Sequence, residues 1–126
     1  MEFENTICTS REQSKNLLEI GLSKKTADMG YYKPNDNAWR LETKFDMTSS
    51  DYLSLDDYTP AWSLTRLLEI CPEHQVHVGS KYVVYYYKEW SRDCEDFQMY
   101  ENVFDNLIEC IKWLISKGEI NKDYLL

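Results

Sequence analysis

The C-terminal part of the chain carries the strongest structural signal. Its apolar side chains recur at helical spacing without a break, at Phe104, Leu107, Ile108, Ile111, Leu114 and Ile115. Asn102 can cap the start of a helix, and Gly118 is suited to its end. The pattern predicts a long amphipathic helix from Val103 to Lys117. Since the apolar face of such a helix must be buried, the rest of the chain has to supply a layer that it covers.

Alternation of apolar and polar residues predicts the strands of that layer. It occurs in Trp39–Phe45, in Val76–Val78 followed by Lys81–Trp90, and in Asp96–Tyr100. The two residues Gly79-Ser80 predict a tight hairpin of type II′, because such a turn takes glycine at its first central position. We expect these strands to pair in antiparallel fashion.

A short helix is predicted before the strands. Ser10 and Gln13 have the spacing of a capping box, and an apolar face follows. The helix is expected from Arg11 to Ile20, with Gly21 in the left-handed position after its last turn and Leu22 folding back on it. The polar, turn-rich residues 23–38 are predicted to be mostly loop.

Another helix is predicted in the middle of the chain. Thr59 precedes Pro60, which is the order of an N-cap residue and a first helical residue. The helix should continue to Ile70, because Pro72 forbids its extension. The acidic residues 46–57 before it are predicted to be a surface loop.

These elements predict an α+β fold. The chain of 126 residues is long enough to bury a core as a single domain, residues 1–126. We expect an antiparallel sheet of three to four strands, packed with two to three helices that include the long C-terminal one.

Charge and composition exclude several partners. The chain has 14 basic and 22 acidic side chains, a net charge of −8, and its longest basic run is Lys24-Lys25. Nucleic acid is not expected as a partner, because duplex binding depends on cations that displace phosphate counterions. The longest apolar run, Tyr82–Tyr87, is far shorter than a bilayer span, so no membrane contact is expected. The four widely spaced cysteines indicate reduced thiols and a cytoplasmic protein.

No common cofactor or catalytic motif is present. Each of the four glycines has a structural use, which leaves none for a phosphate-binding loop. Cys71, His74 and His77 are regularly spaced, but residues three apart on a strand point to opposite faces, so we expect no metal site. No catalytic residue and no cofactor are predicted, and whether the protein is an enzyme is left open.

Aromatic side chains are the best candidates for a binding site. In the predicted strand Lys81–Trp90, Tyr85 and Tyr87 share one face, while Tyr86 lies on the other. Two explanations stand: a central strand covered on both faces, or one open face that serves as a binding platform.

Two tryptophans point away from the apolar stripes of their predicted helices. Trp62 and Trp113 each fit a second packing surface or a contact with a ligand or partner. Arg66 follows Trp62 by one helical turn, so the pair could hold a planar, anionic ligand. The predicted ligand contacts are Trp62, Arg66, Tyr85, Tyr87 and Trp113. Burial of Trp113 in a symmetric homo-oligomer is equally open.

The segment Tyr58–Ile70, with its sequence TPAWSL, resembles the central motif of short uncharacterised proteins from Bacteroides-type genomes, prophages and mobile elements. The stretch Ser10–Met29 and the C-terminal helix with Asn102 and Trp113 are similar to that family too. The resemblance implies a phage or mobile-element origin and a bacterial host cytoplasm. Small accessory proteins of such elements commonly block host defence, which makes a counter-defence role the expectation.

Together these features favour a non-catalytic binding protein that captures a small, nucleotide-like ligand through aromatic side chains and an arginine. An alternative is an acidic protein-interaction module that binds and inhibits a host protein. A third is a small hydrolase or lyase. The expected partner is therefore a small molecule or a host protein.

Overall fold

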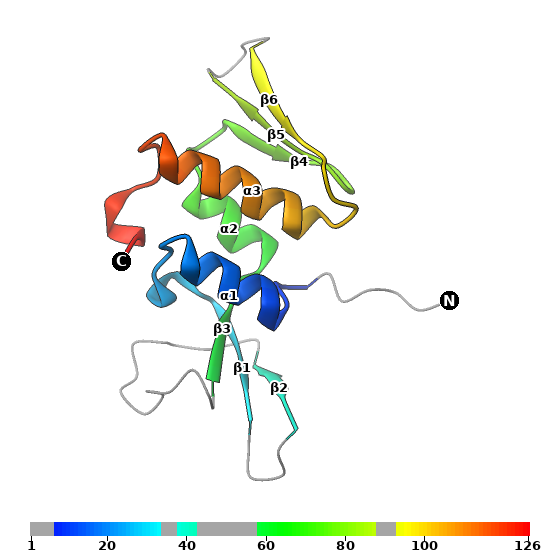
Figure 1. The fold of residues 1–126 in the computed structure, drawn as a ribbon, viewed down its shortest axis with the longest axis vertical. Coiled ribbons are helices and arrows are strands. Elements are labelled where there is room, and N and C mark those ends of the chain that lie inside the picture. The colour runs from blue at the N-terminus through cyan, green and yellow to red at the C-terminus, as the bar shows by residue number, and fades with distance from the viewer. Residues whose placement is uncertain (1–6, 34–37, 43–57, 88–92) are drawn as a thin grey trace. The chain divides into compact units, whose positions relative to one another are not determined.

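The structure is a computed structural model that describes residues 7–33, 38–42, 58–87 and 93–126 (Figure 1). The α+β class is confirmed. The chain forms two compact units, residues 1–66 and 67–126, and each contains one three-stranded antiparallel sheet. The strands thus divide between two sheets, where the sequence led us to expect one. The single domain expected from chain length stays a prediction.

The first helix of unit 1, α1 (Arg11–Glu19), begins and ends as predicted. The Ser10 side chain accepts a hydrogen bond from the backbone of Gln13, and the Gln13 side chain accepts one from the backbone of Ser10. At the other end Gly21 has a φ of 107°, and the N–H of Leu22 donates to the carbonyl of Leu17 at 3.1 Å. Leu22 is fully buried, so the chain folds back onto the helix through an apolar contact. The 3-10 turn η1 (Lys24–Thr26) follows.

The sheet of unit 1 has the order β2-β1-β3, formed by β1 (Met29–Tyr32), β2 (Arg40–Glu42) and β3 (Tyr58–Ala61). The loop predicted for residues 23–38 is therefore wrong over β1. Glycine fits position 30 of this strand because the ring of Tyr58 occupies the space that a Cβ there would need. The predicted strand Trp39–Phe45 is confirmed for Arg40–Glu42, and residues 43–57 lie outside the described residues.

The predicted start of the middle helix is wrong. Thr59 and Pro60 belong to β3, and Pro60 lies opposite Gly30. Among the described strands β3 is an edge strand, where a residue without an N–H is tolerated. The helix α2 spans Leu64–Ile70. Its capping residue is Ser63, whose hydroxyl accepts a hydrogen bond from the N–H of Arg66 at 3.1 Å. Pairing of β3 with β1 outweighs the local preference of the Thr-Pro sequence.

The sheet of unit 2 has the order β4-β5-β6, formed by β4 (Val76–Val78), β5 (Val83–Tyr86) and β6 (Cys94–Phe97). The hairpin is confirmed, but its type II′ turn is wrong. Residues 79–82 connect the strands, the N–H of Gly79 donates to the carbonyl of Tyr82 at 2.8 Å, and Gly79 does not have a positive φ. The third strand begins and ends earlier than the predicted Asp96–Tyr100. Residues 88–92 lie outside the described residues.

The long C-terminal helix is confirmed as α3 (Val103–Ser116). Asn102 caps its start by accepting a hydrogen bond from the N–H of Phe104 at 2.8 Å, and Gly118 follows its end with a φ of 72°. α3 contacts β5 and β6 and lies along one face of their sheet (Figure 1). A second 3-10 turn, η2 (Lys122–Tyr124), comes near the end of the chain. In the described residues no helix is both long and apolar enough to cross a membrane.

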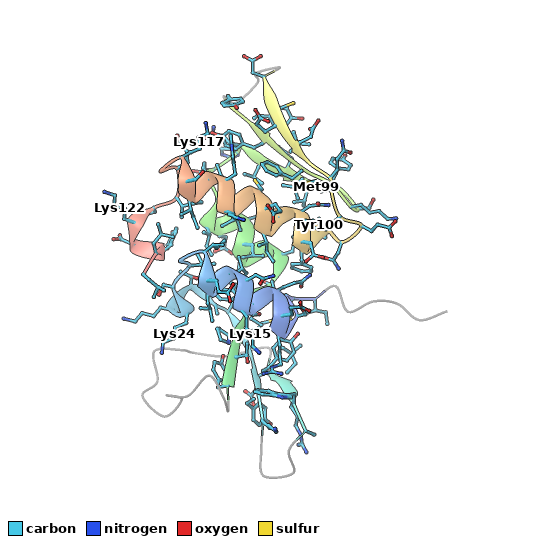
Figure 2. The ribbon with its side chains drawn as sticks, in the orientation of Figure 1. Lys15, Lys24, Met99, Tyr100, Lys117 and Lys122 are labelled. Atoms are coloured by element: carbon cyan, nitrogen blue, oxygen red, sulfur yellow. The ribbon has the colours of Figure 1, made fainter. Side chains whose placement is uncertain are left out.

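A buried asparagine ties α3 to two other segments of unit 2. Asn106 is 0% exposed, and its amide nitrogen donates to the carbonyls of Lys81 and Tyr100. Its amide oxygen accepts a hydrogen bond from the N–H of Tyr100 at 3.0 Å. These three bonds fix the end of the β4–β5 hairpin and the segment between β6 and α3. That segment carries the exposed side chains Met99 and Tyr100 (Figure 2).

Candidate functional site

The structure divides the five predicted ligand contacts between the units. Trp62 and Arg66 belong to unit 1, whereas Tyr85, Tyr87 and Trp113 belong to unit 2. The three members of unit 2 come together in space, with the rings of Tyr85 and Tyr87 both close to that of Trp113. In unit 1, the pairing of an arginine with a tryptophan occurs at other residues than those predicted.

Trp62 is part of the core of unit 1. Its side chain is 0% exposed, and its indole Nε1 donates a hydrogen bond to the hydroxyl of Thr26 at 2.9 Å. Its backbone N–H donates to the hydroxyl of Thr9 at 3.1 Å. Trp62 precedes α2, so the helical face assigned to it from the sequence does not apply. Burial with a satisfied indole N–H fits the packing alternative, which needs no ligand.

Arg66 lies in the first turn of α2 and is half-buried. Its backbone N–H donates to Ser63, and the Ser63 hydroxyl in turn donates to a carboxylate oxygen of Asp28 at 2.5 Å. The backbone of Arg66 therefore takes part in the capping of α2.

A stacked arginine and tryptophan are found at Arg11 and Trp39. The guanidinium carbon of Arg11 lies 3.5 Å from the centre of the Trp39 ring, a close cation–π contact. The ammonium group of Lys33 lies 5.9 Å from the same centre. We call these three residues the Arg11–Trp39–Lys33 group. All three belong to unit 1.

The backbone explains why these side chains meet. β1 and β2 pair Tyr32 with Arg40, and one step further in the same register sets Lys33 opposite Trp39. Arg11 is the first residue of α1, and its Nε donates to the hydroxyl of Thr59 in β3 at 3.3 Å. Because Thr59 is buried, this bond holds the guanidinium in a fixed orientation.

Among the described residues, no ion pair neutralises the positive charge of the Arg11–Trp39–Lys33 group. Arg11 is half-buried, so less water screens its charge than at a fully exposed site. Two cations beside one indole ring can bind an anionic group and a flat ring together.

Sequence reasoning missed this group because its members are separated along the chain and meet only through the contact of α1 with β3 and the pairing of β1 with β2 and β3. One signal was available: Trp39 opens an alternating strand whose polar residues face water. The sequence contains nothing that would place the N-terminus of α1 next to that strand.

In unit 2, Trp113 stands at the centre of an aromatic group. Tyr85, Tyr87 and Phe97 approach it with ring centres 5.1, 6.1 and 5.9 Å away. The two tyrosines meet Trp113 edge-on, the arrangement that aromatic pairs prefer. We call these four residues the Trp113 group. They hold α3 against β5 and β6.

The Trp113 group is buried at one end and open at the other. Tyr85 is 4% exposed, whereas Tyr87 is 44% exposed. Trp113 is half-buried, and the ammonium group of Lys117 lies 5.2 Å from the centre of its ring. Lys117 directly follows α3 (Figure 2). The face of β5 that carries Tyr85 is therefore largely covered, and only its end at Tyr87 is open.

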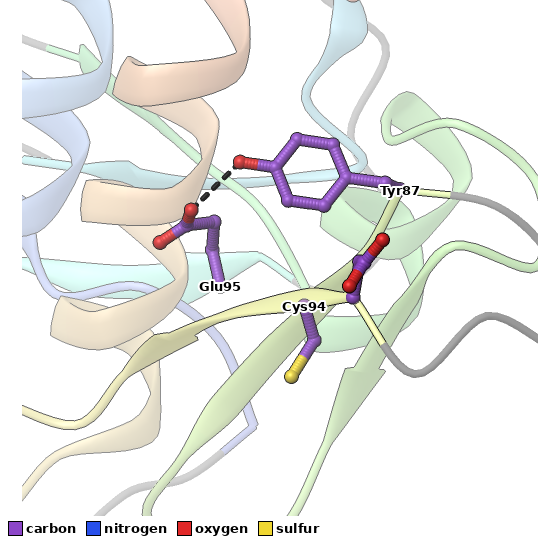
Figure 3. Close-up of a pocket in the computed structure, with 4 residues that line it drawn as sticks. Tyr87, Cys94 and Glu95 are labelled. Atoms are coloured by element: carbon purple, nitrogen blue, oxygen red, sulfur yellow. Dashed lines mark hydrogen bonds between the residues drawn. The ribbon is translucent and has the colours of Figure 1, made fainter.

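An open hollow of about 600 Å³ adjoins Tyr87 (Figure 3). It is lined by Tyr87, Asp93, Cys94 and Glu95. The Tyr87 hydroxyl donates to the Glu95 carboxylate at 2.7 Å. This hydrogen bond, followed by burial, raises the pKa of Tyr87 above its ordinary value. The acidic lining suits a positively charged group better than a phosphate.

The thiols and histidines do not converge on one reactive centre. Burial raises the pKa of Cys71 and that of Cys110, the latter to about 12, so these two thiols stay protonated near neutral pH. His74 and His77 are exposed, and a ring nitrogen of His77 lies 3.1 Å from the carbonyl oxygen of His74. The described residues contain no group of three or more His, Cys, Asp or Glu side chains placed to hold a metal ion.

Comparison of the chain with protein-family models, with curated proteins and with solved structures finds no match.

Proposed function

We propose that this protein is a non-catalytic binding protein that captures a small, planar and negatively charged ligand. The observation that carries the proposal is the Arg11–Trp39–Lys33 group: a guanidinium 3.5 Å from an indole centre, with a second cation 5.9 Å from it. A nucleotide has the matching chemistry, since its base is flat and its phosphates are anionic. In this proposal, Arg11 and Trp39 take the role that the sequence suggested for Arg66 and Trp62.

Preorganisation supports a binding role for this group. The hydrogen bond from Arg11 to the buried Thr59 holds the guanidinium before a ligand arrives, so less side-chain freedom is lost on binding. The Arg11 guanidinium can pair with a phosphate through two parallel hydrogen bonds, and the Lys33 ammonium adds a point charge. The chain as a whole has 14 basic and 22 acidic side chains, so two cations beside one indole ring differ from its overall charge balance.

Titration calorimetry with a panel of cyclic nucleotides and ADP-ribose-type nucleotides tests the proposal. We expect saturable heat with at least one member. The Arg11→Ala and Trp39→Ala variants should each weaken that binding about tenfold or more, which corresponds to about 1.4 kcal/mol. Arg11→Lys keeps the charge but loses the planar stacking, so it should bind with intermediate affinity.

Matched variants separate this site from general charge effects. Lys122→Ala removes one exposed cation in unit 2 and should leave nucleotide affinity unchanged. Thermal unfolding of each variant shows whether lost binding reflects lost folding. Absence of heat with the whole panel, or equal affinity in Arg11→Ala, Trp39→Ala and the unchanged protein, would contradict the proposal.

The phage or mobile-element origin, the host cytoplasm and the counter-defence role are part of the same proposal and rest on the sequence resemblance. Native mass spectrometry of protein purified gently from cells tests the ligand and the oligomeric state together. A retained mass of a few hundred daltons supports ligand capture, and a bare monomer favours a host protein as the partner.

A further inference from the structure

The outer edge of the sheet in unit 2 points to a second binding surface, independent of the proposed ligand site. β6 pairs with β5 on one side only, and among the described residues no strand pairs with its other side. β6 is drawn as an outermost strand of its sheet in Figure 1. An unpaired strand edge presents backbone groups that can join an added strand.

The register shows which backbone groups are available. The N–H of Tyr87 donates to the carbonyl of Asp93 at 3.1 Å, so these two residues form a hydrogen-bonded pair. Hydrogen-bonded and non-hydrogen-bonded pairs alternate in an antiparallel ladder. Cys94 and Tyr86 therefore form a non-hydrogen-bonded pair, and so do Asp96 and Val84. Their N–H and C=O groups point to the open edge.

The side chains along this edge select the charge of the partner. Asp93, Cys94, Glu95 and Asp96 are all exposed, and the segment Asp93–Phe97 contains no basic residue. A second copy of β6 paired antiparallel would set carboxylates against carboxylates, which is destabilising. A strand with lysine or arginine would instead face opposite charges.

Acidic side chains on an edge strand can also serve only to prevent aggregation. The register of β6 is regular over Cys94–Phe97, and the strand contains neither a proline nor a lysine that would block pairing. The exposed Met99 and Tyr100 lie shortly after the end of β6 and add apolar surface to this part of unit 2. These features favour an edge that admits a partner of opposite charge.

We propose that β6 binds a basic, extended segment of another protein, which adds to the sheet of unit 2 as a fourth strand. Backbone hydrogen bonds to Cys94 and Asp96 would supply affinity. The carboxylates of Glu95 and Asp96 would select a segment that carries lysine or arginine. The proposal concerns a different unit from the nucleotide site, so either can fail without the other.

Fluorescence anisotropy with a short labelled peptide tests this inference. The peptide alternates lysine with valine and threonine, and a second peptide carries glutamate in place of lysine. We expect saturable binding of the basic peptide, no binding of the acidic one, and loss of about tenfold in affinity in the Asp96→Lys variant. Asp123→Lys makes the same charge change in η2 and should have little effect.

Backbone recognition is tested separately from charge. A basic peptide N-methylated at alternate residues keeps its charge but cannot donate along one edge, so it should lose most of its affinity. In NMR spectra the amide signals of Cys94 and Asp96 should shift more than that of Glu95 when the unmodified peptide binds. Equal binding of the N-methylated peptide would overturn strand addition. So would failure of the basic peptide to bind, or self-association through β6.

Discussion

Asp28 accepts two hydrogen bonds from Ser63, one from its backbone N–H at 2.9 Å and one from its hydroxyl at 2.5 Å. The Ser63 hydroxyl also accepts the N–H of Arg66, so a carboxylate far away in sequence orients the cap of α2. The start of this helix therefore depends on a tertiary contact within unit 1, in addition to the local sequence.

Replacement of Asp28 by alanine should destabilise the protein. Loss of the carboxylate leaves the Ser63 N–H without its partner and releases the hydroxyl that caps α2, at an expected cost of about 1–2 kcal/mol in the free energy of unfolding. Urea denaturation followed by circular dichroism measures it. Glu19→Ala removes an exposed acid from the end of α1 and should cost nothing measurable. Equal stability of the two variants would contradict the assigned role.

Asn106→Ala should lower the free energy of unfolding more than Asn102→Ala, which removes the cap of α3. The change leaves the carbonyls of Lys81 and Tyr100 and the N–H of Tyr100 without their partner in a buried site, which should cost about 3 kcal/mol. Asn102→Ala removes the cap of α3 and should cost about 1 kcal/mol. Chemical denaturation of both variants gives the comparison. If the Asn106 variant is as stable as the Asn102 variant, the three hydrogen bonds of Asn106 do not have the stabilising role assigned to them.

The two tryptophans of unit 1 should respond differently to truncation. Trp62→Ala opens a cavity in the core and removes the hydrogen bond to Thr26, so the free energy of unfolding should fall by about 4 kcal/mol. Trp39→Ala removes a half-buried ring that stacks on Arg11, and about 1 kcal/mol should be lost. Thermal and urea unfolding check the order. A stable Trp62→Ala variant with altered ligand affinity would restore Trp62 as a binding residue.

Stability should fall in alkaline solution. Burial raises the pKa of Cys110 from 9.0 to about 12, and burial together with the nearby Cys110 raises that of Cys71. Above pH 9 the unfolded chain releases protons that the folded protein retains, so unfolding becomes more favourable as the pH rises towards 12. Each such thiol contributes about 1.4 kcal/mol per pH unit. Urea unfolding between about pH 8 and pH 10.5 should show a shallower decline in Cys110→Ala. An unchanged slope would contradict burial of this thiol in the folded state.

Thiol labelling should distinguish Cys94 from the other cysteines. Cys94 is exposed, whereas Cys8, Cys71 and Cys110 are buried. A thiol-specific reagent should therefore modify one group per chain rapidly and the rest only as the protein unfolds, because access limits their reaction. The Cys94→Ser variant should lose the rapid phase. Rapid labelling of more than one thiol in the folded protein would contradict the described burial.

Local sequence signals predicted the ends of the long elements well. The capping pair Ser10 and Gln13, the cap Asn102 and the terminal glycines act within one helical turn, so their geometry follows from spacing alone. The helices α1 and α3 were predicted within one residue for that reason. The hairpin of unit 2 was also found, since its strands are adjacent in sequence.

Contacts between distant segments could not be predicted. Thr59 and Pro60 form a strand because β1 pairs with them, and the Tyr58 ring lies where a Cβ at Gly30 would be. The same limit applies to the site. The shared face of Tyr85 and Tyr87 follows from strand alternation, but their contact with Trp113 depends on the packing of α3 on the sheet. The meeting of Arg11 with Trp39 likewise depends on the contact of α1 with β3 and on the pairing of β1 with β2 and β3.

The fit of the Tyr58 ring over Gly30 also constrains how this sequence can evolve. Any side chain at position 30 would collide with the ring, while a smaller residue at position 58 would leave a void over a bare glycine. Each single substitution passes through a less stable protein, so the two positions should change together or not at all. Among descendants of this sequence, a residue other than glycine at position 30 should occur only where the tyrosine at position 58 has already been lost.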